Sequence, residues 1–354
     1  WNLLPIELVL WLFKANVHRQ LRRGAVSKNP VLMCFQVLAL MICKSAGSLA
    51  QAPVDLAVAG STALPPRPGR QLVSVWSGGA YLMIDDSPSA APVFTAIDRN
   101  GKQALRYVFT IPGANHIDVI NGRFARGFDG SLALAGSAFT DDSRGSQFVA
   151  WVSPDGQRQT VIRTPGFSPF GVALASDGTI WVAGMEVQNA KEVNPNHNMI
   201  RRYDRAGKLL AAFVPRSSLA IDTDVFDPKW HPGLRSSLVA SRDRVGWYSI
   251  PARTYMEFSL DGQVISHVET IRHDQYTMQG LALCDDGGVF VSTQSNASTG
   301  WKISALDRTR GVWTSIPRNE RWGLLLGCDG ASLAITTNGS SITWLEPRAP
   351  NTRN

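Results

Sequence analysis

A repeated pair of short apolar strands constrains this chain more than any other feature of its sequence. One pattern has two apolar runs on either side of a polar turn, as in "GVALASDGTIWVAG" (171–184). A second pattern has one strand that ends in a polar turn with glycine, as in "IRRYDRAGK" (200–208). The two patterns alternate strictly along the chain. Such turns favour glycine because a tight hairpin needs positive φ.

The repeat has a period of about 50 residues with four short strands in each unit. Glycines close the turns of the second pattern in five successive units, at Gly101, Gly156, Gly207, Gly262 and Gly311. Four-stranded units repeated around an axis form a β-propeller, in which each blade buries its faces against its neighbours. The sequence therefore predicts an all-β, six-bladed β-propeller with four-stranded blades.

The two ends of the repeat predict how the ring closes. The last unit stops at "ITWLEP" (342–347) and lacks a fourth strand, whereas "VDLAVAG" (54–60) is a strand without a unit. We expect this N-terminal strand to complete the last blade, since that covers an otherwise open sheet edge. No composition break interrupts the repeat, so we expect residues 51–354 to form a single propeller domain.

Residues 1–50 have the character of an N-terminal leader. Basic residues precede an apolar run, "VLMCFQVLALMIC" (31–43), and small residues follow it up to Ala50. This order is typical of a secretory signal peptide, and the run is shorter than the roughly 20 residues that span a bilayer. The alternatives are a retained membrane anchor, lipidation at Cys43, and a twin-arginine signal at Arg22-Arg23. We expect an exported protein, periplasmic or extracellular, with cleavage after Ala50 and no stable membrane span in the mature chain.

The positive charge of the chain is concentrated in the leader. The whole sequence carries a formal net charge of +7, but without residues 1–50 it has nearly equal numbers of basic and acidic residues. The remainder shows no basic run. Nucleic-acid binding therefore receives no support from charge.

The third unit carries the best match to a known family. Its residues are Pro169, Gly171, the Asp177-Gly178 pair, the run "IWVA" and then "IRRYDRAGK". With these residues the chain resembles the NHL-repeat propellers and the six-bladed SMP-30/gluconolactonase group, and more loosely the streptogramin-lyase type. The resemblance spans about residues 70–347. It supports the fold but not an activity, because such propellers include hydrolases, lyases and pure binding modules.

The register predicts which end of the propeller holds a binding site. The connections between second and third strands and those between blades emerge on one end, which we call the loop face; the Asp-Gly hairpin turns lie on the other end, the turn face. Four of the five histidines after the leader fall in loop-face connections, and only His267 falls in a strand. The candidate residues on this face are His116, Asp118, Glu186, His197, Asp222, Asp224, His231, His273 and Asp274.

These side chains leave more than one chemistry open. Converging His and carboxylate groups can bind a divalent cation such as Ca²⁺ or Zn²⁺, or act as acids and bases. The alternative is that loops are polar in any propeller. The family's calcium site would need a Glu from the first blade, where this chain reads "VWSGGAYLMIDD". A lyase of the streptogramin type would need paired histidines, for which His231 and His273 are the candidates.

Cys284 and Cys328 occupy similar places near the end of the first strand in neighbouring units, in "LALCDD" and "LLGCDG". An oxidising compartment would favour a disulfide between them, and two buried thiols are the alternative.

The function expected from these observations is an exported propeller, acting as a monomer, that binds a small molecule or a protein partner on its loop face. The alternative is a metal-dependent, lactonase-like hydrolase or lyase with its site at the mouth of the central channel.

Overall fold

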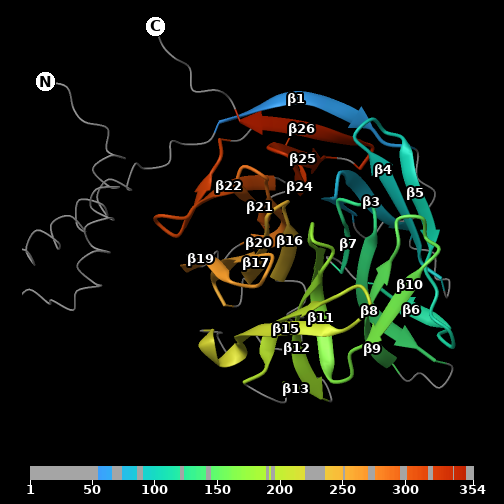
Figure 1. Ribbon diagram of the computed structural model, residues 1–354. Coiled ribbons are helices and arrows are strands. Elements are labelled where there is room, and N and C mark those ends of the chain that lie inside the picture. Colours follow the sequence, from blue (N-terminus) through green and yellow to red (C-terminus); the bar gives the residue numbers. More distant parts are fainter. Residues whose placement is uncertain are drawn as a thin grey trace, which may run out of the picture. The chain divides into compact units, whose positions relative to one another are not determined.

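The computed structural model describes residues 55–65, 74–85, 91–119, 123–140, 145–188, 191–192, 196–219, 236–249, 252–269, 276–295, 301–317, 322–337 and 339–347. All of them belong to one compact unit, Ala52–Asn354. Six antiparallel sheets in this unit are arranged as the blades of a β-propeller (Figure 1). The predicted all-β, six-bladed architecture is therefore confirmed. Among the described residues there is no helix long and apolar enough to cross a membrane.

The first three blades follow in chain order. Blade 1 comprises β2 (Ser74–Ser77), β3 (Ala80–Asp85), β4 (Val93–Asp98) and β5 (Gln103–Val108). Blade 2 comprises β6 (His116–Asp118), β7 (Phe124–Arg126), β8 (Leu132–Phe139), β9 (Gly145–Val152) and β10 (Gln159–Arg163). Blade 3 comprises β11 (Phe167–Leu174), β12 (Ile180–Gln188), β13 (Lys191–Glu192), β14 (Asn198–Tyr203) and β15 (Leu209–Pro215), with the 3₁₀ turn η1 (Arg216–Ser218) after it.

The other three blades have four strands each. Blade 4 comprises β16 (Ser236–Ala240), β17 (Arg244–Ser249), β18 (Thr254–Ser259) and β19 (Val264–Glu269). Blade 5 comprises β20 (Tyr276–Leu283), β21 (Val289–Ser295), β22 (Trp301–Asp307) and β23 (Val312–Ser315). Blade 6 comprises β24 (Leu324–Asp329), β25 (Ser332–Thr336), β26 (Ser341–Pro347) and β1 (Leu56–Ala63).

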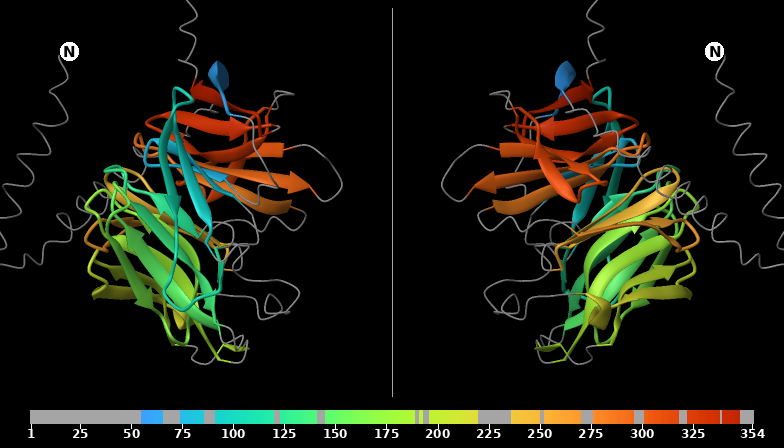
Figure 2. Two further views of the ribbon diagram at one scale, coloured as in Figure 1. Left: turned by 90° about the vertical axis from the view of Figure 1, so that its right-hand side faces the viewer. Right: turned by 90° about the vertical axis from the view of Figure 1, so that its left-hand side faces the viewer.

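The N-terminal strand closes the ring as predicted. The strand β1 pairs antiparallel with β26 as the outermost strand of blade 6, and the blue β1 lies beside the red β26 in Figures 1 and 2. The indole of Trp344 on β26 donates a hydrogen bond to the Thr62 hydroxyl on β1, at 2.9 Å. The same ring meets Trp76 of blade 1 edge to face, with centroids 4.7 Å apart. Ring closure therefore joins both ends of the repeat to the first blade.

The apolar cores lie between the blades rather than within them. Side chains alternate across each strand, so every inner strand sends half of its residues to each neighbouring blade. Trp181 of blade 3, for example, packs on Phe258 of blade 4, with ring centroids 5.7 Å apart. Both side chains are completely buried. The near-continuous apolar runs of the sequence reflect this burial on two faces.

Hairpin turns of the second pattern pack on the outermost strand of the preceding blade. A Cβ added to Gly156 of blade 2 would lie 2.9 Å from the Tyr107 ring on β5, and Gly262 of blade 4 lies against Phe213 on β15 in the same way. Blade 6 has no such turn, because its two outer strands come from opposite ends of the chain. Leu56 and Pro347 face each other at that place.

Candidate functional site

Blade 2 directs a row of polar side chains toward blade 3 at its loop-face end. Asp118 on β6 stands opposite Ser137 on β8, which stands opposite Gln147 on β9. Directly opposite residues share one face of a sheet. The Ser137 hydroxyl donates to the Gln147 side-chain oxygen at 3.2 Å. Two residues deeper on the same face, Ala135 and Val149 belong to the core shared with blade 3.

An arginine joins this row from the break between β6 and β7. The carbonyl oxygen of Arg123 accepts a hydrogen bond from the Ala135 amide at 2.7 Å, so Arg123 continues the β7 register and shares the face of Ala135. Burial lowers the pKa of the Arg123 guanidinium, and the charge of Asp118 opposes that shift. Both side chains are half-buried. Arg123 therefore lies in a partly desolvated position on the innermost strand.

Blade 3 presents an ion pair to the same boundary. Glu186 on β12 stands opposite Phe167, and Arg201 on β14 stands opposite Val182. Both Phe167 and Val182 pack against blade 2, so the charged residues face it too. Arg201 donates to the Glu186 carboxylate at 2.9 Å, and its guanidinium carbon lies 3.8 Å above the Phe167 ring. Gly184 leaves the room that this ring occupies, since an added Cβ would lie 2.5 Å from it.

These six residues form what we call the polar boundary: Asp118, Arg123, Ser137 and Gln147 of blade 2 with Glu186 and Arg201 of blade 3. Neighbouring boundaries differ. The core between blades 1 and 2 contains Ile84, Phe94, Phe109 and Ile117, and the core between blades 3 and 4 contains Phe170, Met185, Met199 and Leu238. A charged lining is therefore a departure from the way in which these other blades pack.

The polar boundary offers both donors and acceptors to a ligand. The two guanidinium groups donate several hydrogen bonds in fixed directions, and the two carboxylates only accept them when ionised. Phe167 adds an apolar surface beneath Arg201. Such a set suits a small polar molecule with its own charged groups. Within the described ranges, no group of three or more His, Cys, Asp or Glu residues is arranged to hold a metal ion.

The predicted site residues occupy different kinds of position in the structure. Asp118 and Glu186 both face the boundary between blades 2 and 3, and both lie in strands rather than in loops. His116 also lies in β6, exposed beside Phe139, so the expectation that only His267 is in a strand was wrong. It faces the same side of blade 2 as Asp118.

His197 lies in the connection that leads into β14, as the sequence predicts. The residue is only 3% exposed, and its carbonyl oxygen accepts a hydrogen bond from the Arg216 amide at 2.8 Å. Within that connection, His197 therefore belongs to the packing of blade 3. The remaining candidates, Asp222, Asp224, His231, His273 and Asp274, lie outside the described residues.

Four members of the polar boundary were missed by sequence reasoning, namely Arg123, Ser137, Gln147 and Arg201. The signal that identifies them is their odd or even position along the strand, because alternate residues point to opposite faces of the sheet. Each lies at a position of its strand that faces a neighbouring blade, where the repeat otherwise has an apolar residue. To know which blade such a position faces, one needs the register between neighbouring strands. Sequence periodicity shows only the alternation of side chains within a single strand.

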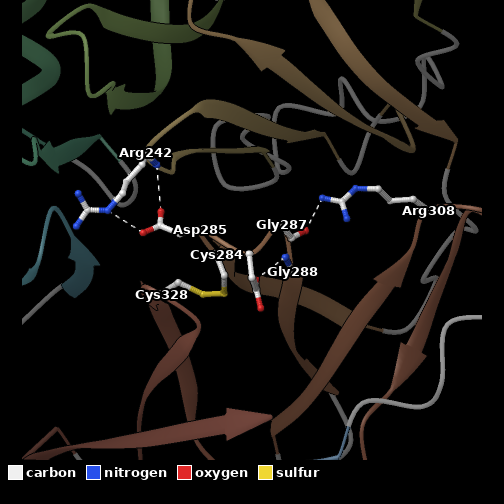
Figure 3. The surroundings of a disulfide bond; sticks show 8 residues. Arg242, Cys284, Asp285, Gly287, Gly288, Arg308 and Cys328 are labelled. Carbon is white, nitrogen blue, oxygen red and sulfur yellow. Dashed lines mark hydrogen bonds and ion pairs between the residues drawn. A yellow bond between two sulfur atoms is a disulfide. The ribbon is translucent and has the colours of Figure 1, made fainter. Parts of the chain in front are cut away.

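A disulfide joins Cys284 and Cys328 on the turn-face side of blades 5 and 6, with their Cα atoms 5.2 Å apart (Figure 3). Cys284 follows β20 directly, and Cys328 lies in β24. The adjacent Asp285 accepts hydrogen bonds from the side chain and the backbone of Arg242 in blade 4, at 3.0 and 3.1 Å. The two innermost strands are therefore fastened together where blade 6 follows blade 5.

Contacts across the turn face link all six blades. Each boundary has at least one hydrogen bond or ion pair between turns: Ser77–Arg126, Asp129–Arg205, Ser176–Arg242, Arg242–Asp285, Asp285–Gly330 and Asp329–Arg99. Polar groups on this face therefore satisfy one another. The polar boundary lies at the opposite, loop-face end of blades 2 and 3.

Comparisons with known proteins do not show a family for this chain. Neither a protein-family model nor a curated protein matches this sequence. Among solved structures, a member of the DUF4221 family from Bacteroides vulgatus is similar, with a TM-score of 0.47 and 9% identity over 84% of this chain and 100% of that one.

Two structures of enzymes show similar values. An oligogalacturonate lyase from Vibrio parahaemolyticus has a TM-score of 0.42 and 10% identity over 80% of this chain and 79% of that one. A puromycin hydrolase has a TM-score of 0.42 and 15% identity over 79% of this chain and 45% of that one. At these values the likeness carries no argument, and the six-bladed β-propeller is established by the six sheets of the structure itself.

Proposed function

We propose that this chain is an exported binding propeller of the NHL-repeat and SMP-30/gluconolactonase-like kind. It takes a small ligand or a protein partner on its loop face, works as a monomer in the periplasm or outside the cell, and loses residues 1–50 as a secretory leader. The observation that carries the proposal is the polar boundary. There, blades 2 and 3 direct charged side chains at each other, whereas blades 1 and 2 and blades 3 and 4 pack together with apolar side chains.

The physical reason is that such a boundary stabilises the protein without a ligand less than an apolar boundary would. Partly desolvated charges stabilise a fold less than apolar packing of the same volume. The ion pair of Glu186 and Arg201 is itself partly solvated, with side chains 32% and 21% exposed, so its contribution to stability is small. A binding role gives a reason for placing these groups here, because ligand contacts reward donors and acceptors that are already oriented.

The test is a binding screen of the purified protein against a library of polar metabolites, followed by thermal shift. We expect a hit whose affinity falls in Glu186→Gln and Arg201→Gln. Arg310→Gln is the matched control, since Arg310 is exposed in a turn of blade 5 on the turn face. A hit that is unchanged in both loop-face variants would place binding elsewhere and overturn the proposal.

Two further measurements address the rest of it. Expression in a bacterial host, with mass spectrometry of the periplasmic fraction, should find a mature chain that begins at Gln51; a chain retained in the cytoplasm contradicts export. Metal analysis with a lactone-hydrolysis assay tests the hydrolase alternative, and stoichiometric metal with turnover would replace the binding role by that one.

A further inference from the structure

Arg123 and Asp118 differ from the other charged pair of the polar boundary. Arg201 has its carboxylate partner at 2.9 Å and the Phe167 ring beneath it. Burial lowers the pKa of the Arg123 guanidinium, and the charge of Asp118 partly opposes that shift. Within the part of the chain that the structure describes, however, the Arg123 guanidinium forms no side-chain hydrogen bond. Its five donors and the acceptors of Asp118 therefore remain for another molecule.

The position of these two residues is fixed by the backbone around them. The innermost strand of blade 2 is broken, with β6 paired to the loop-face end of β8 and β7 paired to its inner part. Asp118 ends the first piece and Arg123 precedes the second. A Cβ added to Gly136 would lie 2.2 Å from the Asp118 carbonyl oxygen, so β6 is held closely against β8. One positive and one negative group are thus held on one sheet face on either side of the break.

The formal charges of these two groups cancel, so the pair favours a ligand that itself carries one positive and one negative charge. A simple anion attracted to Arg123 meets Asp118, and a simple cation attracted to Asp118 meets Arg123. A zwitterion satisfies both, because its carboxylate takes the forked donors of the guanidinium and its ammonium donates to the carboxylate. Glu186 and Arg201 face the same boundary and add no net charge to it.

We propose that Arg123 and Asp118 form a subsite for a zwitterionic α-amino acid or a small peptide terminus, with Arg123 on the carboxylate and Asp118 on the ammonium. This inference rests on the proposed binding function and names the ligand class of that site. Ser137 and Gln147 follow Asp118 in the same row across blade 2, and their side chains are hydrogen-bonded to each other.

The experiment is a titration of the purified protein with the twenty amino acids and with diglycine, followed by ligand-observed NMR and calorimetry. For each hit, its N-acetyl and its C-amide derivatives are titrated as well, since each removes one charge and keeps the side chain. We expect the zwitterion to bind and each derivative to bind about tenfold more weakly or worse.

Two variants assign the charges. Arg123→Gln should remove the preference for the free carboxylate, so that the zwitterion and its C-amide bind alike. Asp118→Asn should remove the preference for the free ammonium, so that the zwitterion and its N-acetyl form bind alike. Arg310→Gln is the control and should bind as the native protein does. If Arg123→Gln fails to fold, Arg123→Lys keeps the charge without the fork, and we expect it to retain part of the carboxylate preference.

The outcomes distinguish this inference from the proposed binding function on which it rests. A polar hit that needs Glu186 and Arg201, with no binding of any zwitterion, keeps the binding function and overturns the amino-acid subsite. Zwitterions that bind with equal affinity to Arg123→Gln, Asp118→Asn and the native protein overturn the subsite as well. A screen in which no ligand depends on the loop face overturns both.

Discussion

The carbonyl oxygen of Asp118 lies where a side chain on Gly136 would begin, 2.2 Å from an added Cβ. This contact ties the short strand β6 to β8 and sets the place of the Asp118 carboxylate. We therefore expect Gly136→Ala to push β6 away and to lower the free energy of unfolding by about 1–3 kcal/mol, the usual cost of overpacking. Chemical denaturation measures it.

The control for that substitution is Gly60→Ala, because an added Cβ at Gly60 has no atom within 4 Å. It should leave the unfolding midpoint within error. Gly136→Ala should also weaken any ligand that depends on Asp118. A Gly136→Ala protein as stable as Gly60→Ala would show that β6 moves freely.

The disulfide between Cys284 and Cys328 spans 44 positions of sequence. Closing a loop of that length in the unfolded chain stabilises the fold by about 2–4 kcal/mol. We expect the double variant Cys284→Ser/Cys328→Ser to unfold earlier in denaturant by that amount. The midpoint of the native protein should fall on adding dithiothreitol, and that of the variant should not. Rapid alkylation of both cysteines without reductant would contradict this bond.

Glu257 is the acceptor of a buried ionic cluster between blades 4 and 5. Its carboxylate is 3.3 Å from Arg244 and 3.1 Å from the Nε of Arg308, and it accepts the Tyr255 hydroxyl at 3.0 Å. Burial, followed by the charge of Glu257, raises the pKa of Tyr255 well above its usual value, so the phenol stays protonated and donates. We expect Glu257→Gln to cost about 1–3 kcal/mol, because both arginines lose a charged acceptor while Arg244 keeps its ion pair with Asp243.

An exposed ion pair provides the comparison. Arg99 and Asp329 lie 3.0 Å apart, with side chains 44% and 29% exposed. Asp329→Asn should cost no more than about 1 kcal/mol. Thermal and chemical unfolding of the two variants side by side measure the difference, and equal costs would mean that Glu257 is not the cluster's centre.

Protonation of Asp129 at low pH should lower the free energy of unfolding. Burial acts to raise the pKa of this carboxyl, but hydrogen bonds from Ser131 and the neighbouring Arg205 outweigh it and hold the pKa below its usual value. The folded state then binds its proton at lower pH than the unfolded state does. Its contribution to stability is complete above the usual value of about 3.9 and is lost as pH falls through the folded pKa. Unfolding titrations between pH 6 and 2 should therefore show a shallower loss in Asp129→Asn.

The ring of six blades was readable from sequence because each unit repeats the same local signals. Turn glycines such as Gly178 and Gly207 have positive φ in the structure, as the turns require. Even the closing strand could be predicted, since one unit lacked a strand and one strand lacked a unit. These inferences need only short-range patterns and the rule that sheet edges are covered.

The polar boundary was readable only in part. Asp118 and Glu186 stood out as charges near predicted connections. Arg201 did not, because "IRRYD" reads as an ordinary strand until its register with Val182 shows which blade it faces. Arg123 did not, because the break between β6 and β7 interrupts the strand signal of that unit. Long-range register decides which side chains meet, and no local pattern encodes it.

Leu56 and Pro347 pair with each other at the turn-face end of blade 6, where the first and the last described strands of the ring meet. Both points lie on the same outer edge and at the end remote from the polar boundary. A fluorophore, an affinity handle or a surface attachment introduced at either point would hold the molecule by its turn face. The loop face would then remain open to solution, which makes immobilised binding measurements feasible with either orientation of the fusion.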